Sequence, residues 1–223
     1  MKILKFNSLK DPNIGLYNVC NDNIAITGLE LDDKEKKELK DSMDVEIYKI
    51  SVLRTNLVGI FTILTNDYLL YPSALYDDEK EALKKIASDI GIEHLEINTK
   101  YTAIGNIIAI NGKRILISDN LDKSIYNELR DLGFNVNTIE IPYVDVVGQL
   151  IVTWDNLAII SPLIDENTEQ DIVKYLKIKK YVKTTVNFAN PFVRSGILMN
   201  EKAILVGRTT TGPELANLSE LIE

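Results

Sequence analysis

Ile14-Gly15-Leu16 is the first of four short phrases in which an aliphatic residue, a glycine and one further residue follow one another. The others are Val58-Gly59-Ile60, Ile104-Gly105-Asn106 and Val147-Gly148-Gln149, at separations of 44, 46 and 43 residues. A fifth copy falls at Val193-Arg194-Ser195, 46 residues beyond Gly148, with arginine in the place of glycine. A period of this length indicates one supersecondary unit used repeatedly, each copy burying its apolar face against its neighbours.

Each unit is predicted to contain a strand, a turn, a second strand, a helix and a third strand. In the first unit, strands at Ile14–Val19 and Ile24–Thr27 flank the polar triplet Asn21-Asp22-Asn23, which is typical of a hairpin turn. The corresponding turns are Asn66-Asp67, Asn111-Gly112, Asp155-Asn156 and Asn200-Glu201, of which Asn111-Gly112 best fits a type I′ turn. Third strands are expected at Val45–Ile50, Ile92–Ile97, Val136–Ile141 and Tyr181–Val186.

Helix starts are predicted where an N-cap residue precedes a carboxylate or amide by three positions. The pairs are Asp32 with Glu35, Asp78 with Glu81, Asn167 with Gln170, and Thr211 with Glu214, the last joined by Pro213 in the first turn. Gly91 and Gly133 stand where left-handed residues end helices.

The fifth unit ends in its helix at Glu223 and lacks a third strand. Lys2–Phe6 has the character of that strand, and Phe6 precedes Gly15 by the nine residues that separate Ile50 from Gly59. We therefore expect the N-terminal strand to complete the last unit and close the ring, which removes exposed sheet edges.

The sequence thus predicts an α/β fold, a five-fold pseudosymmetric α/β propeller of strand-strand-helix-strand repeats. We expect one domain over residues 1–223. Its approximate repeats are 8–52, 53–98, 99–142, 143–187, and 188–223 completed by strand 2–6.

Charge and composition narrow the classes of partner. The net charge is −8, from 33 acidic and 25 basic residues. A negative body repels phosphate, so extensive nucleic-acid binding is disfavoured and a basic protein partner is favoured, although an acidic surface also serves solubility. The single cysteine, Cys20, allows no intramolecular disulfide, and no apolar stretch reaches the roughly 18 residues of a membrane span. We expect a soluble, cytoplasmic protein that does not enter membranes.

Residues for catalysis are few. With one cysteine and one histidine, Cys20 and His94, the chain cannot assemble a Cys/His zinc site, and it carries neither a Gly-x-Ser-x-Gly elbow nor a phosphate-binding P-loop. Acidic pairs such as Asp32-Asp33 fall at helix starts, where carboxylates are favourable without any catalytic role. No catalytic residue, metal ligand or cofactor is predicted.

Two features could form a binding surface. By pseudosymmetry, the residues that follow the repeat glycine should gather around the axis at one end of the ring: Leu16, Ile60, Asn106, Gln149 and Ser195. Such a mixed apolar and amide surface suits a protein-binding face, or it simply plugs the centre of the ring. The only tryptophan, Trp154, falls at a hairpin turn, where it either anchors an interface or packs against the next repeat.

The C-terminal third carries a family resemblance. The run Thr185-Val186-Asn187-Phe188-Ala189-Asn190-Pro191-Phe192-Val193-Arg194-Ser195-Gly196 leads through Asn200 and Gly207 to Thr210-Thr211-Gly212-Pro213-Glu214-Leu215. This run resembles the end of the archaeal translation initiation factor 6 family. Pro12-Asn13-Ile14-Gly15, Leu57-Val58-Gly59 and Ala103-Ile104-Gly105-Asn106 are similar to that family's repeat starts in order and spacing, so the resemblance spans essentially the whole chain.

The resemblance implies a pentein-type propeller without chemistry of its own. It implies a monomeric factor that binds the large ribosomal subunit, prevents its premature association with the small subunit and takes part in large-subunit biogenesis. The contact it implies is chiefly with a basic ribosomal protein beside the sarcin–ricin loop, with limited rRNA contact. It places Ile60, Asn106 and the loop Phe192–Ser195 toward the ribosome. With Gln149 of the same ring, the predicted ribosome-binding residues are Ile60, Asn106, Gln149, Phe192, Arg194 and Ser195.

Two departures from the family pattern concern the fifth repeat. Arg194 and Ala189 stand where the family commonly has glycine, and Lys202-Ala203 replaces a glycine-containing turn. These substitutions leave the shape of the fifth loop open.

The alternative function is that of a pentein-type guanidine-modifying hydrolase or transferase. Such enzymes place a cysteine, a histidine and acidic groups at the ring centre. Cys20 and His94 would have to converge there within hydrogen-bond reach.

Overall fold

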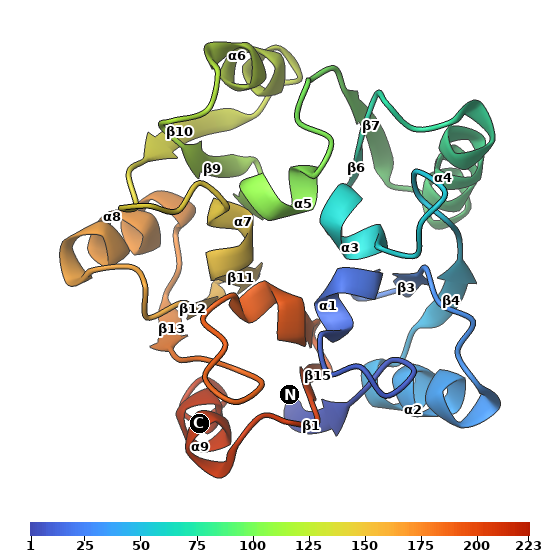
Figure 1. The fold of residues 1–223 in the computed structure, drawn as a ribbon, viewed down its shortest axis with the longest axis vertical. Helices are drawn as coiled ribbons and strands as arrows, with labels where there is room; N and C mark the ends of the chain where they lie inside the picture. The colour runs from blue at the N-terminus through green and yellow to red at the C-terminus, as the bar shows by residue number, and fades with distance from the viewer.

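Five three-stranded sheets stand around a central axis, each with a helix on its outer side, in the computed structural model, which describes residues 1–223 (Figure 1). In every sheet the first two strands of the unit are antiparallel, and the third strand runs parallel to the second. The predicted five-fold α/β propeller is confirmed.

The first three units have the following bounds. Unit one holds β2 (Asn18–Cys20), β3 (Ile24–Thr27), α2 (Asp33–Met43) and β4 (Glu46–Lys49). Unit two holds β5 (Ile63–Leu64), β6 (Tyr68–Pro72), α4 (Asp77–Ile90) and β7 (Glu93–Ile97). Unit three holds β8 (Ala109–Asn111), β9 (Arg114–Ser118), α6 (Lys123–Asp131) and β10 (Asn135–Ile139).

The last two units follow the same order. Unit four holds β11 (Ile151–Trp154), β12 (Leu157–Ile160), α8 (Glu166–Leu176) and β13 (Lys180–Lys183). Unit five holds β14 (Ile197–Met199), β15 (Ala203–Gly207) and α9 (Gly212–Ser219). Its third strand is β1 (Lys2–Phe6), which runs parallel to β15 from the pair Lys2–Ala203 to the pair Phe6–Gly207. The predicted closure by the N-terminal strand is therefore confirmed.

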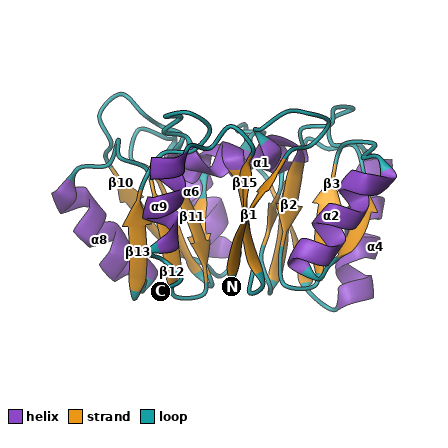
Figure 2. Cartoon of the chain, turned by 90° about the horizontal axis from the view of Figure 1, so that it is seen from below, coloured by secondary structure: helices purple, strands orange, loops and turns teal.

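The predicted first strand of each unit is wrong in its first half. The repeat phrases form short helical turns, namely α1 (Ile14–Tyr17), α3 (Val58–Phe61), α5 (Ile104–Ile107), α7 (Val147–Leu150) and the 3₁₀ turn η1 (Val193–Gly196), and the strand begins only afterwards. These turns lie together at one end of the ring, which we call the turn face, while the hairpin turns lie at the other end, the hairpin end (Figure 2). The repeat phrase and the strand that follows it both contain aliphatic residues, and for this reason the sequence was interpreted as one long strand.

Two of the four predicted helix starts are correct. The helices α2 and α9 begin after Asp32 and Thr211, and the carboxylates of Glu35 and Glu214 bind back to the backbone N–H groups of these residues. The starts at Asp78 and Asn167 are wrong, because the N-caps of α4 and α8 lie two residues earlier.

The caps of α4 and α8 explain these shifts. Tyr76 is the N-cap of α4, and Asp165 is the N-cap of α8. The carboxylate of Asp165 accepts hydrogen bonds from the backbone N–H groups of Asn167 and Thr168, so it satisfies donors that the first helical turn leaves unpaired.

Turn and strand ends also differ in detail from the predictions. Asn111 pairs with Arg114, so the turn residues are Gly112 and Lys113, and only Gly112 has positive φ; this is not the type I′ turn expected at Asn111-Gly112. Gly91 and Gly133 have positive φ at helix ends as predicted. The third strands are shorter than expected, for example Glu46–Lys49 in place of Val45–Ile50, because only these residues pair with the second strand.

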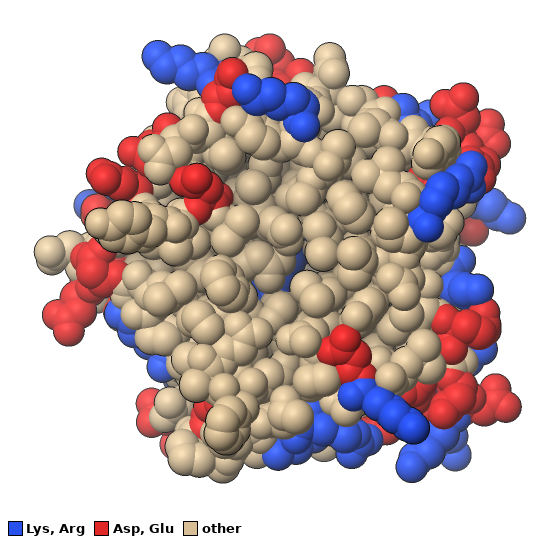
Figure 3. All heavy atoms as spheres, viewed as in Figure 1, with Lys and Arg blue, Asp and Glu red and all other residues tan.

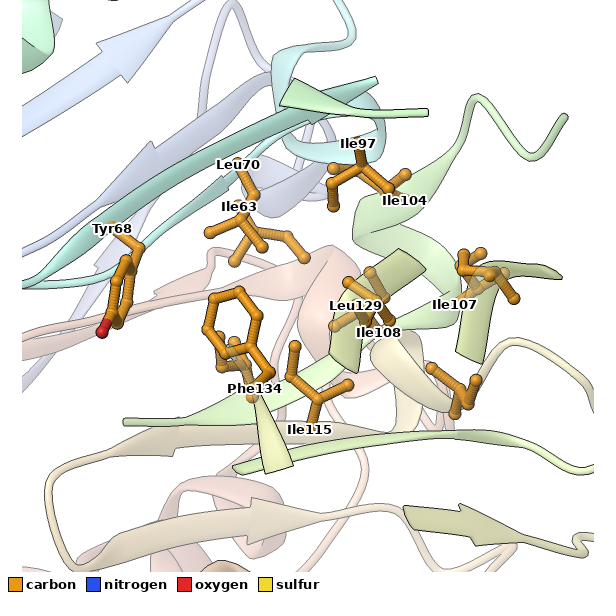
Figure 4. Packing of buried hydrophobic residues seen from close by; sticks show 13 residues of the cluster. Ile63, Tyr68, Leu70, Ile97, Ile104, Ile107, Ile108, Ile115, Leu129 and Phe134 are labelled. Atoms are coloured by element: carbon orange, nitrogen blue, oxygen red, sulfur yellow. The ribbon is translucent and has the colours of Figure 1, made fainter. Parts of the chain in front are cut away.

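The apolar core is shared between neighbouring units. One cluster joins Tyr68 and Leu70 of β6 to Ile115 of β9 and Leu129 of α6 in the next unit (Figure 4). Tyr68 meets Phe134 edge to face, with ring centres 5.1 Å apart, a favourable aromatic geometry. Each unit therefore completes its core only when its neighbour is folded. None of the helices combines the length and apolar character needed to cross a membrane.

Candidate functional site

The repeat glycines bring the five turns of the turn face into backbone contact. A Cβ atom on Gly59 would lie 2.0 Å from the carbonyl oxygen of Gly15, and one on Gly105 would lie 2.3 Å from that of Gly59. Gly148 stands in the same relation to Gly105, at 2.6 Å, and Gly15 to the carbonyl oxygen of Arg194, at 1.9 Å. The period read from the sequence is thus the spacing of residues that must lack a side chain where successive turns meet.

Ile60, Asn106 and Gln149 follow three of these glycines, and the turns α3, α5 and α7 carry them around the axis. Ile60 and Asn106 are partly exposed, whereas Gln149 is only 6% exposed. The amide Nε2 of Gln149 donates a hydrogen bond to Oδ1 of Asn106 at 2.7 Å. Gln149 therefore offers little surface of its own and orients the Asn106 amide.

The predicted residues of the fifth repeat separate into two groups. Phe192 is 37% exposed, and Ser195 is buried, where its hydroxyl donates to the Phe192 carbonyl at 2.7 Å and accepts from Asn190 Nδ2 at 3.0 Å. Arg194 lines a cavity along the ring axis. Of the six predicted residues, Gln149 and Ser195 are thus buried, Ile60, Asn106 and Phe192 present surface, and Arg194 is partly exposed and lines the cavity.

Four of the loops that precede the turns contain residues with positive φ, and in three of these loops a helix glutamate binds such a residue. The Leu9 N–H donates to Glu35 at 2.8 Å, and the Arg54 N–H donates to Glu79 at 2.9 Å. Ala189 N–H donates to Glu214 at 2.9 Å. All three donors belong to the left-handed residues of the chain, with φ of 49°, 58° and 68°. Because each carboxylate sits at a helix start and holds a loop amide, the turn face is rigid although loops build it.

Glu214 is the most extensively bound of these glutamates. Burial raises the pKa of its carboxyl, but hydrogen bonds from Thr211, Thr185 and Ala189 outweigh burial and hold the pKa below its usual value. The loop Asn187–Ala189 is therefore anchored by a carboxylate that stays ionised near neutral pH.

The centre of the turn face is largely uncharged. Figure 3 shows most acidic and basic side chains toward the perimeter around a broad, mainly neutral centre, with basic atoms visible only in a small hollow in its middle. Sequence reasoning missed Phe188, which is 80% exposed, and Leu9 and Tyr143, which are also exposed. A signal was present: each is an apolar or aromatic residue in a loop with turn chemistry, outside the periodic apolar pattern of the core.

A cavity of about 470 Å³ runs along the axis between the innermost strands β2, β5, β8, β11 and β14. Trp154 lies in its wall and packs against the core of the fifth unit, which agrees with the expectation that it packs against the next repeat. Its indole N–H also donates to Oδ1 of Asp22 at 2.9 Å, which joins the fourth unit to the first. The indole of Trp154 thus makes its contacts within the molecule.

Cys20 and His94 do not form the pair that the enzyme alternative requires. Cys20 lies on the innermost strand β2 and lines the cavity, and burial raises the pKa of its thiol to about 12, so the thiol is protonated at neutral pH. His94 lies exposed on β7, the outer strand of its sheet, with Nδ1 3.4 Å from the hydroxyl of Tyr71. No group of three or more His, Cys, Asp or Glu side chains is placed to hold a metal ion.

Comparisons with known proteins give consistent family matches. The model of the eIF-6 family matches residues 3–221. A translation initiation factor 6 from Staphylothermus marinus is 28% identical over 98% of this chain and 96% of its own length. One from Sulfolobus acidocaldarius is 33% identical over 92% of both chains, and one from Pyrococcus horikoshii is 26% identical over 100% of this chain and 99% of its own length.

Two solved structures that match this fold at low sequence identity are enzymes. DDAH from Pseudomonas aeruginosa has a TM-score of 0.49 and 11% identity, and the match covers 96% of this chain and 73% of that one. An agmatine deiminase of Enterococcus faecalis has a TM-score of 0.45 and 12% identity over 82% of this chain and 68% of its own. At these scores the two enzymes bear on neither the chemistry nor the substrates of this chain.

Proposed function

The chain belongs to the eIF-6 family, and from that membership we propose that it is a translation initiation factor that binds the large ribosomal subunit through its turn face. The observation that carries the proposal is the neutral, rigid centre of this face, where Ile60, Asn106 and Phe192 are accessible. Protein interfaces have such a core of apolar and amide groups with few charges, surrounded by a polar rim.

Preorganisation supports tight binding at this face. The loops are held by Glu35, Glu79 and Glu214, and the turns touch one another backbone to backbone at the glycines. A surface that is already ordered loses little conformational entropy when a partner docks, so more of the interaction energy appears as affinity.

The charge of the whole chain favours a basic ribosomal protein as the main contact. With a net charge of −8, the molecule repels rRNA phosphates and attracts a positively charged protein surface. We propose that rRNA contact is limited and that a basic ribosomal protein near the sarcin–ricin loop receives the turn face.

Steric occlusion is sufficient for the proposed activity. A rigid monomeric ring seated on the joining surface of the large subunit would block the small subunit without hydrolysis, cofactor or covalent step. The same occupancy during assembly would give the factor a role in large-subunit biogenesis. Release then depends on another factor, because the chain contains no P-loop that would couple release to nucleotide hydrolysis.

Co-sedimentation in sucrose gradients with separated ribosomal subunits tests the proposal. The wild-type protein should migrate with the large subunit only and should reduce the amount of joined ribosomes when both subunits are present. Ile60→Arg should weaken binding by about tenfold or more, because it places a cation in the neutral centre against a basic partner. Asn106→Ala should weaken it by about 5- to 20-fold, since it removes a polar contact and leaves the Gln149 amide unpaired.

Ile222→Arg is the matched control, because Ile222 is also exposed and apolar but lies at the C-terminal end of the chain, beside the hairpin end (Figure 2). Ile222→Arg should bind the large subunit like the wild type. A rise in salt concentration from 50 to 300 mM should slow the association of all variants with the subunit. Unchanged affinity of Ile60→Arg and Asn106→Ala would move the site away from the turn face. Absence of wild-type binding to the large subunit would refute the function itself.

A further inference from the structure

The axial cavity contains a cation that the protein itself leaves without a partner. Arg194 belongs to the turn η1 at the turn face and lines the cavity with a guanidinium that carries five donors. It forms no salt bridge, and its side chain takes part in no hydrogen bond. The two arginine–carboxylate pairs of the molecule, Arg54 with Asp78 and Arg208 with Glu38, both lie on the outer surface.

The surroundings of this guanidinium favour an added acceptor. Burial lowers the pKa of Arg194 to about 10, so the group still carries its charge at neutral pH. Arg194 is only partly exposed, and a charge with reduced access to water gains from an acceptor that pairs with it. The ionisable group that acts on Arg194 is the Cys20 thiol, which is protonated at neutral pH and supplies no compensating charge.

The rest of the cavity has two further zones. Its wall along the inner strands includes Ile63, Ile110, Ile151 and Ile197 on four of the five strands, together with polar residues such as Thr65 and Thr153. Its hairpin end is acidic, with Asp22, Asp67 and Asp155 at the turns. Asp22 is already engaged by Trp154, by Asn66 and by the backbone N–H of Glu201, whereas no hydrogen bond is recorded for the side chains of Asp67 and Asp155.

We propose that the axial cavity is a binding site for a small, elongated carboxylate. Its carboxylate group pairs with the guanidinium of Arg194, its apolar body lies along the isoleucines, and its far end, neutral or cationic, meets the aspartates of the hairpin end. The volume of about 470 Å³ falls within the roughly 300–1,000 Å³ of small-molecule pockets. A phosphate dianion fits less well, because the three aspartates oppose its entry and its second charge has no partner.

The site is distinct from the proposed ribosome-binding surface. Arg194 lines the cavity, whereas Ile60, Asn106 and Phe192 do not. The two proposals are therefore tested by separate measurements, and failure of one leaves the other intact.

Isothermal titration calorimetry of the full-length protein against four probes at matched ionic strength tests this inference. The probes are 6-aminohexanoate, hexanoate, hexylamine and inorganic phosphate. We expect saturable binding in the order 6-aminohexanoate, then hexanoate, with phosphate and hexylamine weaker than both. Arg194→Gln should weaken the two carboxylates at least tenfold, because it removes the charge while keeping a polar side chain. Arg130→Gln, an exposed arginine of α6, is the control and should bind like the wild type.

Thermal unfolding without ligand provides a second readout. Because the guanidinium has no carboxylate partner in the protein, Arg194→Gln should be at least as stable as the wild type, and 6-aminohexanoate should raise the melting temperature of the wild type alone, by roughly 3–6 °C at ten times Kd.

Three results would overturn the proposal. These are no saturable binding of either carboxylate, equal binding by the wild type and Arg194→Gln, or hexylamine bound more tightly than hexanoate. If Arg194→Gln does not fold, the order of the affinities of the wild type for the four probes still tests the proposal.

Discussion

At the scale of single residues, the turn face depends on carboxylates that bind backbone amides. Glu35, Glu79 and Glu214 each stand at a helix start and accept hydrogen bonds from loop residues with positive φ. Non-glycine residues in the left-handed region are strained, so these hydrogen bonds hold the loops in conformations that they would otherwise leave. The exposed side chains of the face, such as Phe188, owe their positions to these buried anchors.

Glu214→Gln tests this anchoring through pH. The pKa of Glu214 in the folded protein lies below the unfolded value of about 4.3, so its stabilisation is complete above that pH and is lost as the pH falls through the folded pKa. At pH 7 the variant should be less stable by about 1–3 kcal/mol, since it loses charge-assisted hydrogen bonds. Urea denaturation at pH 7 and pH 3 should show the difference shrinking at the lower pH.

Glu81→Gln is the control for this comparison, because Glu81 is exposed and makes no recorded hydrogen bond or salt bridge. It should stay within about 0.5 kcal/mol of the wild type at both values. A difference between Glu214→Gln and the wild type that is the same at pH 3 and pH 7 would contradict the ionised anchor.

At the scale of elements, the short turns around the axis are shaped by each other. A four-residue helix has no stability of its own in water. The turns α1, α3, α5 and α7 persist because each glycine lets its backbone rest on a carbonyl of the preceding turn. The 3₁₀ turn η1, with Arg194 in the glycine's place, is the member that departs from α-helical geometry.

Gly59→Ala should therefore destabilise the protein by about 3 kcal/mol or more, because the new Cβ would lie 2.0 Å from the carbonyl oxygen of Gly15 and the backbones must move apart. Gly212→Ala, in the first turn of α9 with open space around it, should be neutral or slightly stabilising. Chemical denaturation of the two variants measures this contrast. Similar stabilities would mean that the turns are not held by close backbone contact.

At the scale of the whole molecule, stability comes from interfaces between units. The core clusters span neighbouring units, so the closed ring buries apolar surface at five junctions, whereas an open array would leave one exposed. The last junction depends on β1, which joins residues 2–6 to residues 203–207. The chain is thus closed by its two ends, and the N-terminal strand is an integral part of the fold.

Leu4→Pro tests the closure. Lys2 N–H donates to the Lys202 carbonyl at 3.1 Å, and the two-residue alternation of a strand directs Leu4 N–H to β15 as well. Proline at position 4 removes this donor and should cost about 2–4 kcal/mol beyond the effect of Leu4→Ala. Lys5→Pro, whose N–H points away from β15, should cost less. Equal losses in the two proline variants, measured by urea denaturation, would show that pairing with β15 is not what β1 contributes.

Much of the architecture is encoded locally in the chain. Two features were enough to predict five units and their closure. They are the spacing of the repeat glycines, Gly15, Gly59, Gly105 and Gly148, and the additional strand Lys2–Phe6 before the first unit. The helix caps at Asp32 and Thr211 could also be predicted from the sequence, because an N-cap and its partner three residues later form a local pattern. The starts at Asp78 and Asn167 were wrong, since neighbouring polar residues compete for the cap.

The candidate site is harder to predict from the sequence, because the exposure of a side chain depends on residues from other units. Sequence reasoning placed Ile60, Asn106, Gln149, Phe192, Arg194 and Ser195 on one surface, and the structure leaves Gln149 and Ser195 buried and turns Arg194 to the axial cavity. Phe188 and Tyr143 were missed because exposure of an aromatic side chain follows from loop geometry rather than from a period.

By itself, the sequence determined the number of units, their order, the closure of the ring and the family, all of which follow from repeated short patterns along the chain. Only the tertiary structure decided that the repeat phrases are helical turns, which face is neutral, and that one guanidinium lies unpaired on the axis. The physical reason is that these properties arise where backbones and side chains of different units approach within van der Waals distance, and no local pattern records that approach.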